Sequence, residues 1–564
     1  LPANIINQII PQIVVHISHK DKNVREVVQA IISNFGSKHF QAVVFALNVL
    51  SLLGNGEISS ISSAMIEELG SKCPKTYSDS RLFIDGMHRS AVSWLEQWLT
   101  TLDTASRAQQ ANDRESVIQL IQQQYERWSM PQCETDRQFI NNFGQMFQRS
   151  RILFEKYKTG DITAIRPMWD SFRSLFAELD DKMKKTETIL LPKVSEELAN
   201  KRHFHLAIPG TYNVEGSSPQ IHYIEPALHI LSTQQHPRIV YMCDTEGVRW
   251  KFLLKGNEDL RLDQRIMQFF NLINSLIMTN RNTLDLDVSI LKYAIVPFAP
   301  NAGLITWVTG ADTFQQLVID YRHHRDIRQS MELEIAQQYV GNIFNSLSAL
   351  QRYEVFNIIA SQSRANELRE MLWLRSPDPS SWLQRNWNFT ISTALMSMAG
   401  YTIGLGDRHP SNIMVQRHTG RVIHIDFGDS FEVANNRVVF AERVPFRMTR
   451  MIVNALDGGS VDGLFRRSCE ELLWVLRENQ SSVIAQLEVF VHEPIFNGRE
   501  IRSSEREQKG ILERVANKLS GRDPEPFDNP NVELDVDEQV NTLIKLASDP
   551  KEYVRHYIGW CPFW

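Results

Sequence analysis

Three polar side chains in the C-terminal part of the sequence have the spacing that phosphoryl transfer needs. Asp407 and Asn412 stand five residues apart in a short polar loop, and Asp426 follows fourteen residues after Asn412. Asp426 opens an Asp-Phe-Gly triplet after the apolar run 422–425. One acid near an acceptor hydroxyl and two oxygen ligands for Mg²⁺ on ATP are the usual groups of such a site. The segment therefore predicts a site that transfers a phosphoryl group.

The order of residues in this loop narrows the class of site. Conventional protein kinases write His-Arg-Asp with Asn five residues after Asp, whereas this loop reads Asp407-Arg408-His409 with the same Asp-to-Asn spacing. The reversed order resembles the phosphatidylinositol-3-kinase-like superfamily. The plain alternative is a polar turn between two buried strands. Three oxygen ligands at kinase spacing, with a strand before Asp426, favour phosphoryl transfer.

The segments before this loop are helical at first. Residues 1–77 carry apolar residues at helical spacing, which predicts the end of an α-solenoid. Residues 78–186 predict four amphipathic helices. Along one side of the first, which we expect to be a single long helix, stand Phe83, Met87, Ala91, Trp94, Trp98 and Leu102. Such aromatic stripes are typical of the core of a helix bundle.

From about residue 203 the pattern changes to short strands, and after residue 312 helices dominate, interrupted by the catalytic segment. The expected strands are 228–231, 238–242, 250–255, 293–298 and 304–308, with one helix at 263–278. A small antiparallel sheet followed by a helical lobe is what a two-lobed kinase needs. Residues 493–530 read as a linker around one helix. The last segment, 532–564, ends in an aromatic string that we expect to pack against the helical lobe.

Composition sets wider limits. The chain has 564 residues, of which 43% are hydrophobic and 22% charged, as in globular proteins of about three or four domains. A net charge of −6 gives no reason to expect nucleic-acid binding. The five cysteines have no metal-ligand spacing, and no apolar run is long enough to span a bilayer. Because the sequence starts at Leu1 without Met, we expect a piece of a larger protein.

Longer motifs make the chain resemble the target of rapamycin kinases. Beside the catalytic loop, the stretches that carry the resemblance are 207–212, 254–261, 444–451 and 557–564. The resemblance implies a mainly α protein with an α+β kinase domain. Its expected parts are the end of a helical FAT solenoid (1–77), an FRB-like four-helix bundle (78–186), a PI3K-like kinase with an antiparallel β N-lobe (187–309) and a helical C-lobe (310–531), and a short helical FATC tail (532–564).

The resemblance also implies a nucleotide site. Lys255 corresponds to the strand lysine that contacts ATP phosphates, and Asp263 to its carboxylate partner. The residues expected around the adenine are Leu231, Tyr293, Trp307, Val308, Met414 and Ile425. The turn 231–237 has no glycine, so the Thr233 hydroxyl and backbone N–H groups would contact the phosphates.

Roles in catalysis follow from the same resemblance. Asp407 would orient the acceptor hydroxyl and take its proton, and His409 would donate to the transferring phosphate or share in proton movement. Asn412 and Asp426 would hold Mg²⁺, or Mn²⁺ in its place. The sequence leaves open whether Asp407 or His409 is the base. The implied activity is transfer of the ATP γ-phosphate to Ser or Thr of protein substrates, in growth and nutrient signalling.

Partners are implied as well. Family members dock a WD-repeat β-propeller subunit on a helical insertion, which residues 325–352 resemble; an ordinary amphipathic helix pair is the alternative. HEAT-repeat scaffold subunits would bind through a region N-terminal to this chain. The resemblance implies a cytoplasmic protein, or one peripheral on endomembranes, with no transmembrane segment and no nucleic-acid partner.

The chain departs from the family in two places. In the bundle, the residues that match the rapamycin-binding groove are Leu102, Ser106, Trp169 and Phe176. Gln110 and Arg173, however, stand where a phenylalanine and a tyrosine are expected, so we expect weak or absent binding of the rapamycin–immunophilin complex. In the tail, Cys561 is the only cysteine, which excludes a disulfide within it, and the insert that usually precedes the tail is reduced to about residues 497–509.

Two rival interpretations remain. Lipid kinases of the same superfamily tend to carry a basic cluster in the activation loop for inositol phosphates. Here residues 427–446 carry three acidic against two basic side chains, which favours a protein substrate. A pseudokinase scaffold is the second rival, and it is opposed by the retention of Lys255, Asp407, Asn412 and Asp426.

Overall fold

The chain folds into two compact units. The computed structural model describes residues 2–53, 56–128, 130–233, 235–280, 289–437, 440–492, 505–523 and 533–564. One unit holds residues 1–260 and 294–307, and the other holds 261–293 and 308–564. Much of the expected linker and reduced insert, at 493–504 and 524–530, lies outside the described residues, as does Gln234. In the ranges described, no helix combines the length and hydrophobicity needed to cross a membrane.

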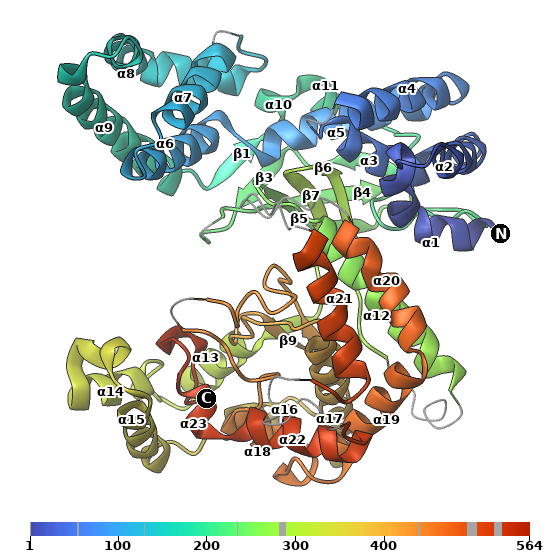
Figure 1. The fold of residues 1–564 in the computed structure, drawn as a ribbon, viewed down its shortest axis with the longest axis vertical. Coiled ribbons are helices and arrows are strands. Elements are labelled where there is room, and N and C mark those ends of the chain that lie inside the picture. The colour runs from blue at the N-terminus through green and yellow to red at the C-terminus, as the bar shows by residue number, and fades with distance from the viewer. Residues whose placement is uncertain are drawn as a thin grey trace. The chain divides into compact units, whose positions relative to one another are not determined.

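Stacked helices begin the N-terminal unit, as the apolar spacing predicts (Figure 1). They are α1 (Ala3–Ile13), α2 (Lys22–Gly36), α3 (Phe40–Ser51), α4 (Gly56–Lys72) and α5 (Pro74–Ala91). Asp21 caps α2 by accepting the N–H of Asn23 at 2.8 Å, and Pro74 starts α5 where its missing N–H is not needed. The core between these helices includes Ile10, Ile32, Val43, Leu47 and Leu69.

The expected long first helix of the bundle is in fact two helices. After α5 ends at Ala91, α6 (Trp94–Gln110) starts behind Ser93, whose side chain accepts the Glu96 N–H. Glu96 in turn accepts the Ser93 N–H at 3.0 Å, and this capping box ends one helix and starts the next. The apolar stripe is therefore divided between two cores, with Phe83, Met87 and Ala91 under the sheet and Trp98 and Leu102 in the bundle.

The bundle is completed by three further helices. These are α7 (Arg114–Trp128), α8 (Glu134–Lys158) and α9 (Ile165–Lys184). Their aromatic stripes meet in the centre, where the Trp98 ring lies 4.4 Å from Phe147 and 5.1 Å from Tyr125, measured between ring centroids. Offset and edge contacts of this kind add stability beyond the burial of area. The prediction that the stripes form a bundle core is confirmed for these residues.

An antiparallel sheet follows. Its strands and short helices are β1 (Thr188–Leu190), α10 (Leu191–Val194), α11 (Glu196–Asn200), β2 (Ile221–Ile224), β3 (Ala227–Ile230), β4 (Arg238–Asp244), β5 (Arg249–Gly256), β6 (Ile295–Ala299) and β7 (Ala302–Thr306). The strand order is β1-β3-β4-β5-β7-β6, with β2 paired to β4. Because β7 ends at Thr306, no partner remains for Tyr293, which precedes β6 instead of lying in it.

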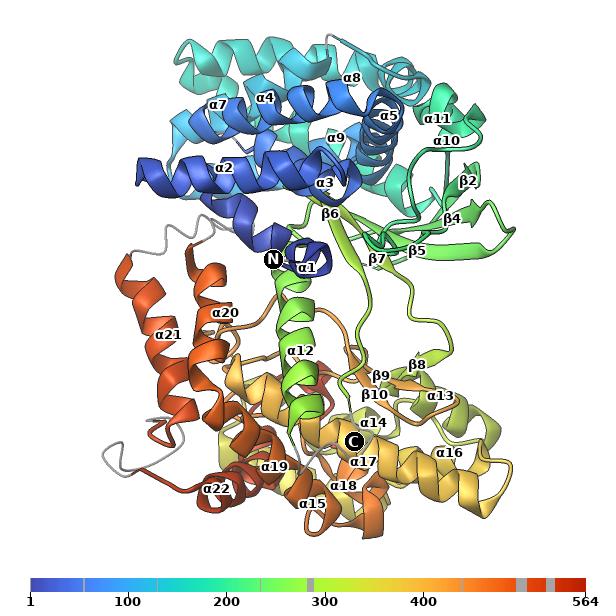
Figure 2. The same cartoon turned by 90° about the vertical axis from the view of Figure 1, so that its right-hand side faces the viewer.

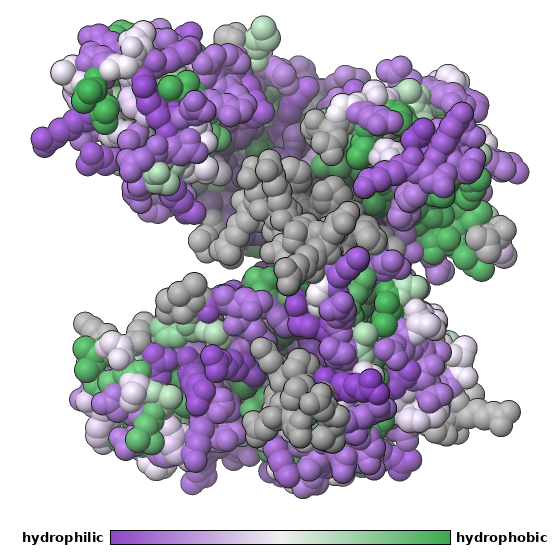
Figure 3. Space-filling view, viewed as in Figure 1, coloured by the Kyte–Doolittle hydropathy of each residue, from purple (hydrophilic) through white to green (hydrophobic). Residues whose placement is uncertain are grey.

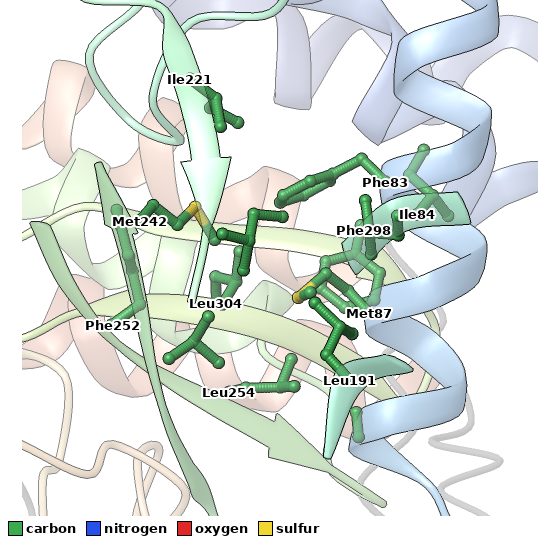
Figure 4. Close-up of a cluster of buried hydrophobic side chains, with 14 of the residues drawn as sticks. Phe83, Ile84, Met87, Leu191, Ile221, Met242, Phe252, Leu254, Phe298 and Leu304 are labelled. Carbon is green, nitrogen blue, oxygen red and sulfur yellow. The ribbon is translucent and has the colours of Figure 1, made fainter. Parts of the chain in front are cut away.

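Helix α5 covers one face of this sheet. Figure 4 shows Phe83, Ile84 and Met87 of α5 pointing toward Leu254, Phe298 and Leu304 of the strands. Helix α5 and the sheet approach each other closely at the end of β5, where a Cβ on Gly256 would lie 1.9 Å from the carbonyl oxygen of Ala91. Only glycine fits there, which fixes the distance between α5 and the strand that carries Lys255.

The C-terminal unit is mainly helical (Figure 2). Its elements are α12 (Arg261–Thr279), β8 (Ala311–Thr313), α13 (Phe314–His324), α14 (Met331–Val340), α15 (Ala349–Gln362), α16 (Glu367–Leu374), α17 (Pro379–Thr402), β9 (Ile413–Gln416), β10 (Val422–His424), α18 (Arg450–Ala455), α19 (Leu464–Glu478), α20 (Gln480–His492), α21 (Glu505–Leu519), α22 (Val536–Ser548) and α23 (Pro550–Tyr553). Helix α17 is buried along its second half and packs on α19 and β10. Helix α12 packs on α19 and α20.

The aromatic tail is part of the C-terminal core. Trp560 and Phe563 are 1% and 2% exposed and share a cluster with Ile335, Phe356 and Val355 of α14 and α15. Trp564 is only partly buried, and its indole N–H donates to Glu332 at 3.4 Å. The expectation that the tail packs against the helical lobe is confirmed for Trp560 and Phe563.

Replacing Trp560 by alanine tests the weight of this packing. Loss of a fully buried indole should lower the free energy of unfolding by about 3–5 kcal/mol. Trp474, which is 39% exposed on α19, supplies the control, because its replacement by alanine leaves a much smaller cavity. Chemical denaturation of both variants measures the difference. Equal stability of the two variants would contradict the assigned role of the tail.

Candidate phosphoryl-transfer site

A strand hairpin brings the predicted metal ligands together. In the antiparallel pair β9 and β10, Ile413 lies opposite His424. Asn412 therefore lies across from Ile425, whose N–H donates to the Asn412 carbonyl at 3.0 Å. Asp426 follows directly and is exposed, whereas Asn412 is buried. The fourteen-residue spacing in the sequence is thus the length of this hairpin.

Two aspartates of the site have left-handed backbone conformations. The φ angle is +57° at Asp407 and +61° at Asp426, which is unfavourable for residues other than glycine. Each costs about 1–3 kcal/mol, and such strain persists only where surrounding contacts impose it. The buried Arg408 supplies those contacts, because its guanidinium donates to the carbonyls of Gly406 (2.7 Å), Ile425 (2.9 Å) and Asp426.

Arg408 was not predicted as a functional residue. It lies between the two candidate catalytic side chains in sequence, yet it points away from solvent and holds the backbone of both loops. Its burial lowers the pKa of the guanidinium, an effect opposed by the charges of Asp426 and Asp407. The sequence offered one signal, an arginine in a short loop that is flanked by apolar runs.

Asn412 has a fixed orientation. Its side-chain NH₂ donates to the Asp407 carbonyl at 2.9 Å, and its backbone N–H donates to the His409 carbonyl at 2.9 Å. The side-chain oxygen is therefore the atom left to hold a cation. Together with the carboxylate of Asp426 it gives an all-oxygen donor set, which suits Mg²⁺.

The tautomer of His409 follows from its hydrogen bonds. The ring Nδ1 accepts the Ser411 N–H at 3.2 Å, so in the neutral ring the proton sits on Nε2. That nitrogen lies 3.9 Å from the Asp407 carboxylate. Burial lowers the pKa of His409, although the Asp407 charge opposes this, and the neutral form is favoured at neutral pH. His409 is accordingly a hydrogen-bond donor toward the site.

Asp407 is also approached by the tail and by the segment after Asp426. The Tyr557 hydroxyl donates to one carboxylate oxygen of Asp407 at 3.4 Å, and Arg437 lies 3.9 Å from the same oxygen. Arg437 also forms an ion pair with Asp429. Burial and the nearby Asp407 charge raise the pKa of Tyr557, which therefore keeps its proton and remains a donor.

The N-terminal unit holds four of the predicted nucleotide residues, which are Leu231, Thr233, Lys255 and Trp307. Lys255 lies near the end of β5 and pairs with Glu258 at 2.8 Å. The turn after β3 is closed by the Leu231 N–H donating to the Pro237 carbonyl at 2.9 Å, and it contains Thr233. Trp307 follows β7, and the ammonium of Lys251 lies 3.5 Å from the centre of its ring.

The remaining predicted adenine and phosphate residues belong to the C-terminal unit. The Asp263 carboxylate, at the start of α12, accepts the Phe427 N–H at 3.4 Å. Burial raises the pKa of Tyr293, and the charges of Asp263 and Asp426 add to this. Met414 and Ile425 are half-buried at the hairpin, and Val308 is half-buried beyond the end of β7. The partnership of Lys255 with Asp263 stays a prediction.

The predicted groove residues of the bundle differ in their exposure to solvent. Leu102 is buried in the bundle core, Ser106 and Trp169 are half-buried, and Phe176 is exposed. Gln110 is exposed at the end of α6, and Arg173 is exposed on α9, where it pairs with Asp170 at 3.1 Å. The polar pair therefore lies on the outer surface beside the apolar residues.

Comparisons with known proteins give these features a class. The profile of the phosphatidylinositol 3- and 4-kinase family matches residues 249–499, that of the FKBP12-rapamycin binding domain matches 86–181, and that of the FATC domain matches 533–564. A solved structure described as the FAT and kinase domain of CtTel1 has a TM-score of 0.69 at 22% identity, over 100% of this chain and 34% of that chain. The fold is therefore that of a phosphatidylinositol-kinase-like catalytic domain, and the predicted fold class is confirmed.

Similar proteins point to one branch of this class. The serine/threonine-protein kinase tor1 of Schizosaccharomyces pombe is 32% identical over 100% of this chain and 26% of that protein. For the serine/threonine-protein kinase TOR2 of Saccharomyces cerevisiae the identity is 32%, over 99% of this chain and 24% of that protein. The chain spans about a quarter of the length of the curated relatives it matches. The chain belongs to the target of rapamycin family.

The two polar groove residues generate a binding prediction. Burying the polar groups of Gln110 or Arg173 under an apolar drug, away from water or a partner, costs about 1–3 kcal/mol each, and 1.4 kcal/mol is a tenfold change in affinity. We therefore expect the chain to bind the rapamycin–immunophilin complex weakly or not at all. The double variant Gln110→Phe with Arg173→Tyr should bind at least about tenfold more tightly in a titration of the whole chain.

A matched control is Arg149→Tyr, which places the same new side chain on the exposed face of α8, outside the predicted groove. Its affinity should equal that of the unchanged chain. Nanomolar binding by the unchanged chain would show that the groove assignment is wrong.

Proposed function

We propose that the chain is the catalytic part of an ATP- and Mg²⁺-dependent protein serine/threonine kinase that acts in growth and nutrient signalling. The observation that carries the proposal is the hairpin register, in which Asp426 follows Ile425, the residue across from Asn412, while the Asn412 side chain is hydrogen-bonded to the loop that bears Asp407 and His409. Membership of the target of rapamycin family supports it, since the similar proteins are named serine/threonine-protein kinases. That the whole protein phosphorylates Ser or Thr of protein substrates is also part of this proposal.

Asp407 is the base in this proposal. The proton of neutral His409 sits on the nitrogen that faces the site, so the ring has no free acceptor there. The Asp407 carboxylate has acceptor oxygens within the site, and it would orient the acceptor hydroxyl and take its proton. His409 then donates a hydrogen bond to the transferring phosphate, where negative charge has to be stabilised. The hydrogen bond to His409 Nδ1 therefore supports Asp407, of the two candidates, as the proposed base.

The predicted residues supply the proposed contacts with the nucleotide. In the N-terminal unit, Lys255 and Thr233 are the proposed contacts for the phosphates, and Leu231 and Trp307 for the adenine. In the C-terminal unit, the proposed contacts are Asp263, Tyr293, Val308, Met414 and Ile425. Asn412 and Asp426 would hold Mg²⁺, which supplies positive charge to the phosphates when bound. Most of the rate gain would come from positioning and charge stabilisation.

Protein substrates are favoured over lipids. Arg437, one of two basic residues in the segment 427–446, is engaged by Asp429 and lies near Asp407 and Glu442. It is therefore not a free phosphate-binding group of the kind that an inositol phosphate needs. A pseudokinase is disfavoured because the acid, amide and acid are all present and ordered around one hairpin.

The helical insertion is the proposed docking site for a WD-repeat β-propeller subunit. Residues 325–352 contain α14 and the start of α15, and the apolar side chains exposed there are Leu333, Tyr339, Ile343 and Leu350. Figure 3 shows hydrophobic side chains on this part of the surface. Exposed apolar side chains that gather on one part of a surface mark an interaction site. We also propose that HEAT-repeat scaffold subunits bind the protein. The proposed location is the cytoplasm, with peripheral contact with endomembranes.

Replacing Asp407 or Asp426 by alanine tests the proposed activity. Each change removes a charge that acts on the reacting groups, so the turnover number should fall about a thousandfold or more. Asp462→Ala, which removes an exposed acid paired with Arg466, is the control and should keep full activity. Transfer of radiolabelled phosphate from ATP to protein and phosphoinositide substrates, assayed in parallel, measures both activity and substrate class.

Near-normal turnover in both variants would falsify the assigned site. Faster labelling of phosphoinositide than of protein would overturn the substrate class instead. All three variants should still unfold cooperatively, but the Asp407 and Asp426 variants should melt at a lower temperature than the unchanged chain, because alanine tolerates the φ angles of +57° and +61° less well than aspartate.

A further inference from the structure

A buried glutamate contacts the backbone of the catalytic loop. Glu442 is 3% exposed and lies in the segment between Asp-Phe-Gly and α18. One carboxylate oxygen, Oε2, accepts the Asp407 N–H at 2.8 Å. The other, Oε1, makes no hydrogen bond among the described residues and lies 3.8 Å from Arg437. The sequence pattern counted Glu442 only as one acidic residue of this segment.

Small residues around the Glu442 carboxylate leave room for it. A Cβ on Gly406 would lie 3.5 Å from Oε2 and 2.2 Å from the Cβ of Ala434, so a larger residue before Asp407 would displace this segment. The Glu442 N–H donates to the Ala434 carbonyl at 3.1 Å, which holds the backbone of Glu442 in place. Burial of an acid is costly, and burial raises the pKa of Glu442 to about 7.

The contact acts on a strained residue. Asp407 has a φ of +57°, and its amide can meet Oε2 only while the loop keeps that conformation. A hydrogen bond from an amide to a carboxylate is stronger than one to a neutral acceptor. We infer that Glu442 is a positioning residue for phosphoryl transfer, which holds the Asp407 backbone so that the Asp407 carboxylate faces the acceptor hydroxyl. This inference rests on the proposed function, because it takes Asp407 as the base.

A purely structural role would have different consequences. If Glu442 only anchored its own segment, its loss would lower stability and weaken every ligand contact together. A positioning role predicts loss of turnover with nucleotide binding retained, because the Glu442 carboxylate accepts the N–H of the proposed base, Asp407, and acts through it. The two roles can therefore be separated by kinetics.

Two substitutions of Glu442 separate the effect of side-chain length from the effect of its charge. Glu442→Gln keeps an acceptor at the same reach and removes the charge, whereas Glu442→Asp keeps the charge and withdraws the oxygens by one methylene. We expect Glu442→Asp to lower kcat about 10- to 100-fold, as small displacements of catalytic groups do. Glu442→Gln should keep at least about a third of kcat at pH 6.5, and KM for ATP should change less than about threefold in both.

The pH profile gives a second readout. The groups that face Glu442 are Asp407 and Arg408 of the catalytic loop, Arg437 of its own segment, and Arg447 and Tyr557. Because the pKa of Glu442 is raised to about 7, its charge is gained as the pH rises through that value. In the unchanged chain kcat should therefore rise through about pH 7, as the ionised acceptor holds the amide more firmly. In Glu442→Gln this rise should be absent.

The experiment is steady-state phosphoryl transfer by the whole chain between pH 6 and 8. The control is Glu432→Gln, which removes the charge of a half-buried glutamate in the same segment, whose carboxylate pairs with Lys518 and Arg514. It should lower the melting temperature without the pH signature. Equal kcat in the Asp and Gln variants, or a tenfold rise in KM for ATP in both, would overturn the positioning role.

Failure of the proposed function gives a different result. An unchanged chain without phosphoryl transfer, or an active Asp407→Ala variant, overturns that function together with this inference. An active unchanged chain whose Glu442→Asp variant keeps kcat within twofold overturns the inference alone. Thermal unfolding of each variant confirms that the compared proteins are folded.

Discussion

The buried guanidinium of Arg408 is the interaction on which the rest of the site depends. It donates to carbonyls on both sides of the hairpin, at Gly406 before Asp407 and at Ile425 and Asp426 after β10. An arginine can do this because its donors form a rigid fork with a permanent charge. Two left-handed aspartates are thereby held at one place. Without this contact, each would relax toward ordinary backbone conformations and the acid–amide–acid geometry would be lost.

The tail is joined to the same loop by a second arginine. Arg447 donates to the carbonyls of Trp560 (2.6 Å) and Cys561 (2.8 Å), and its guanidinium lies 4.2 Å from the centre of the Trp560 ring. The same side chain lies within 3.4 Å of the Arg408 carbonyl. Docking of the tail and geometry of the catalytic loop therefore share one buried charge. The last residue of the tail lies near a third buried arginine. Arg322 pairs with Glu332 and Glu367, and its guanidinium lies 5.4 Å from the centre of the Trp564 ring.

Much of the fold and of the site could be predicted because each depends on local pattern. Helical spacing found the bundle, alternation found β4 and β5, and the loop spacing found the residues around the hairpin. The break between α5 and α6 was missed because the apolar stripe continues through it, and only the Ser93–Glu96 capping box marks it. Tyr293 was placed in a strand because its neighbours are apolar, although its partner strand ends too early.

The residues that hold the site could not be found in this way. Arg408, Glu442 and Arg447 act through contacts with backbone atoms of segments distant in sequence, and a backbone contact leaves no pattern of residue types. Their burial is also unexpected, because charged residues are rarely buried unless they are paired. Only the fold shows that each of these charges has a partner.

The most direct test of this account is single-turnover phosphoryl transfer by an Arg408→Lys variant. Lysine keeps the positive charge but cannot reach three carbonyls at once. The account predicts transfer at least about a hundredfold slower, with nucleotide affinity changed only a few-fold, because the aspartates lose their backbone geometry while the rest of the site remains. Transfer at the unchanged rate in a folded variant would contradict it.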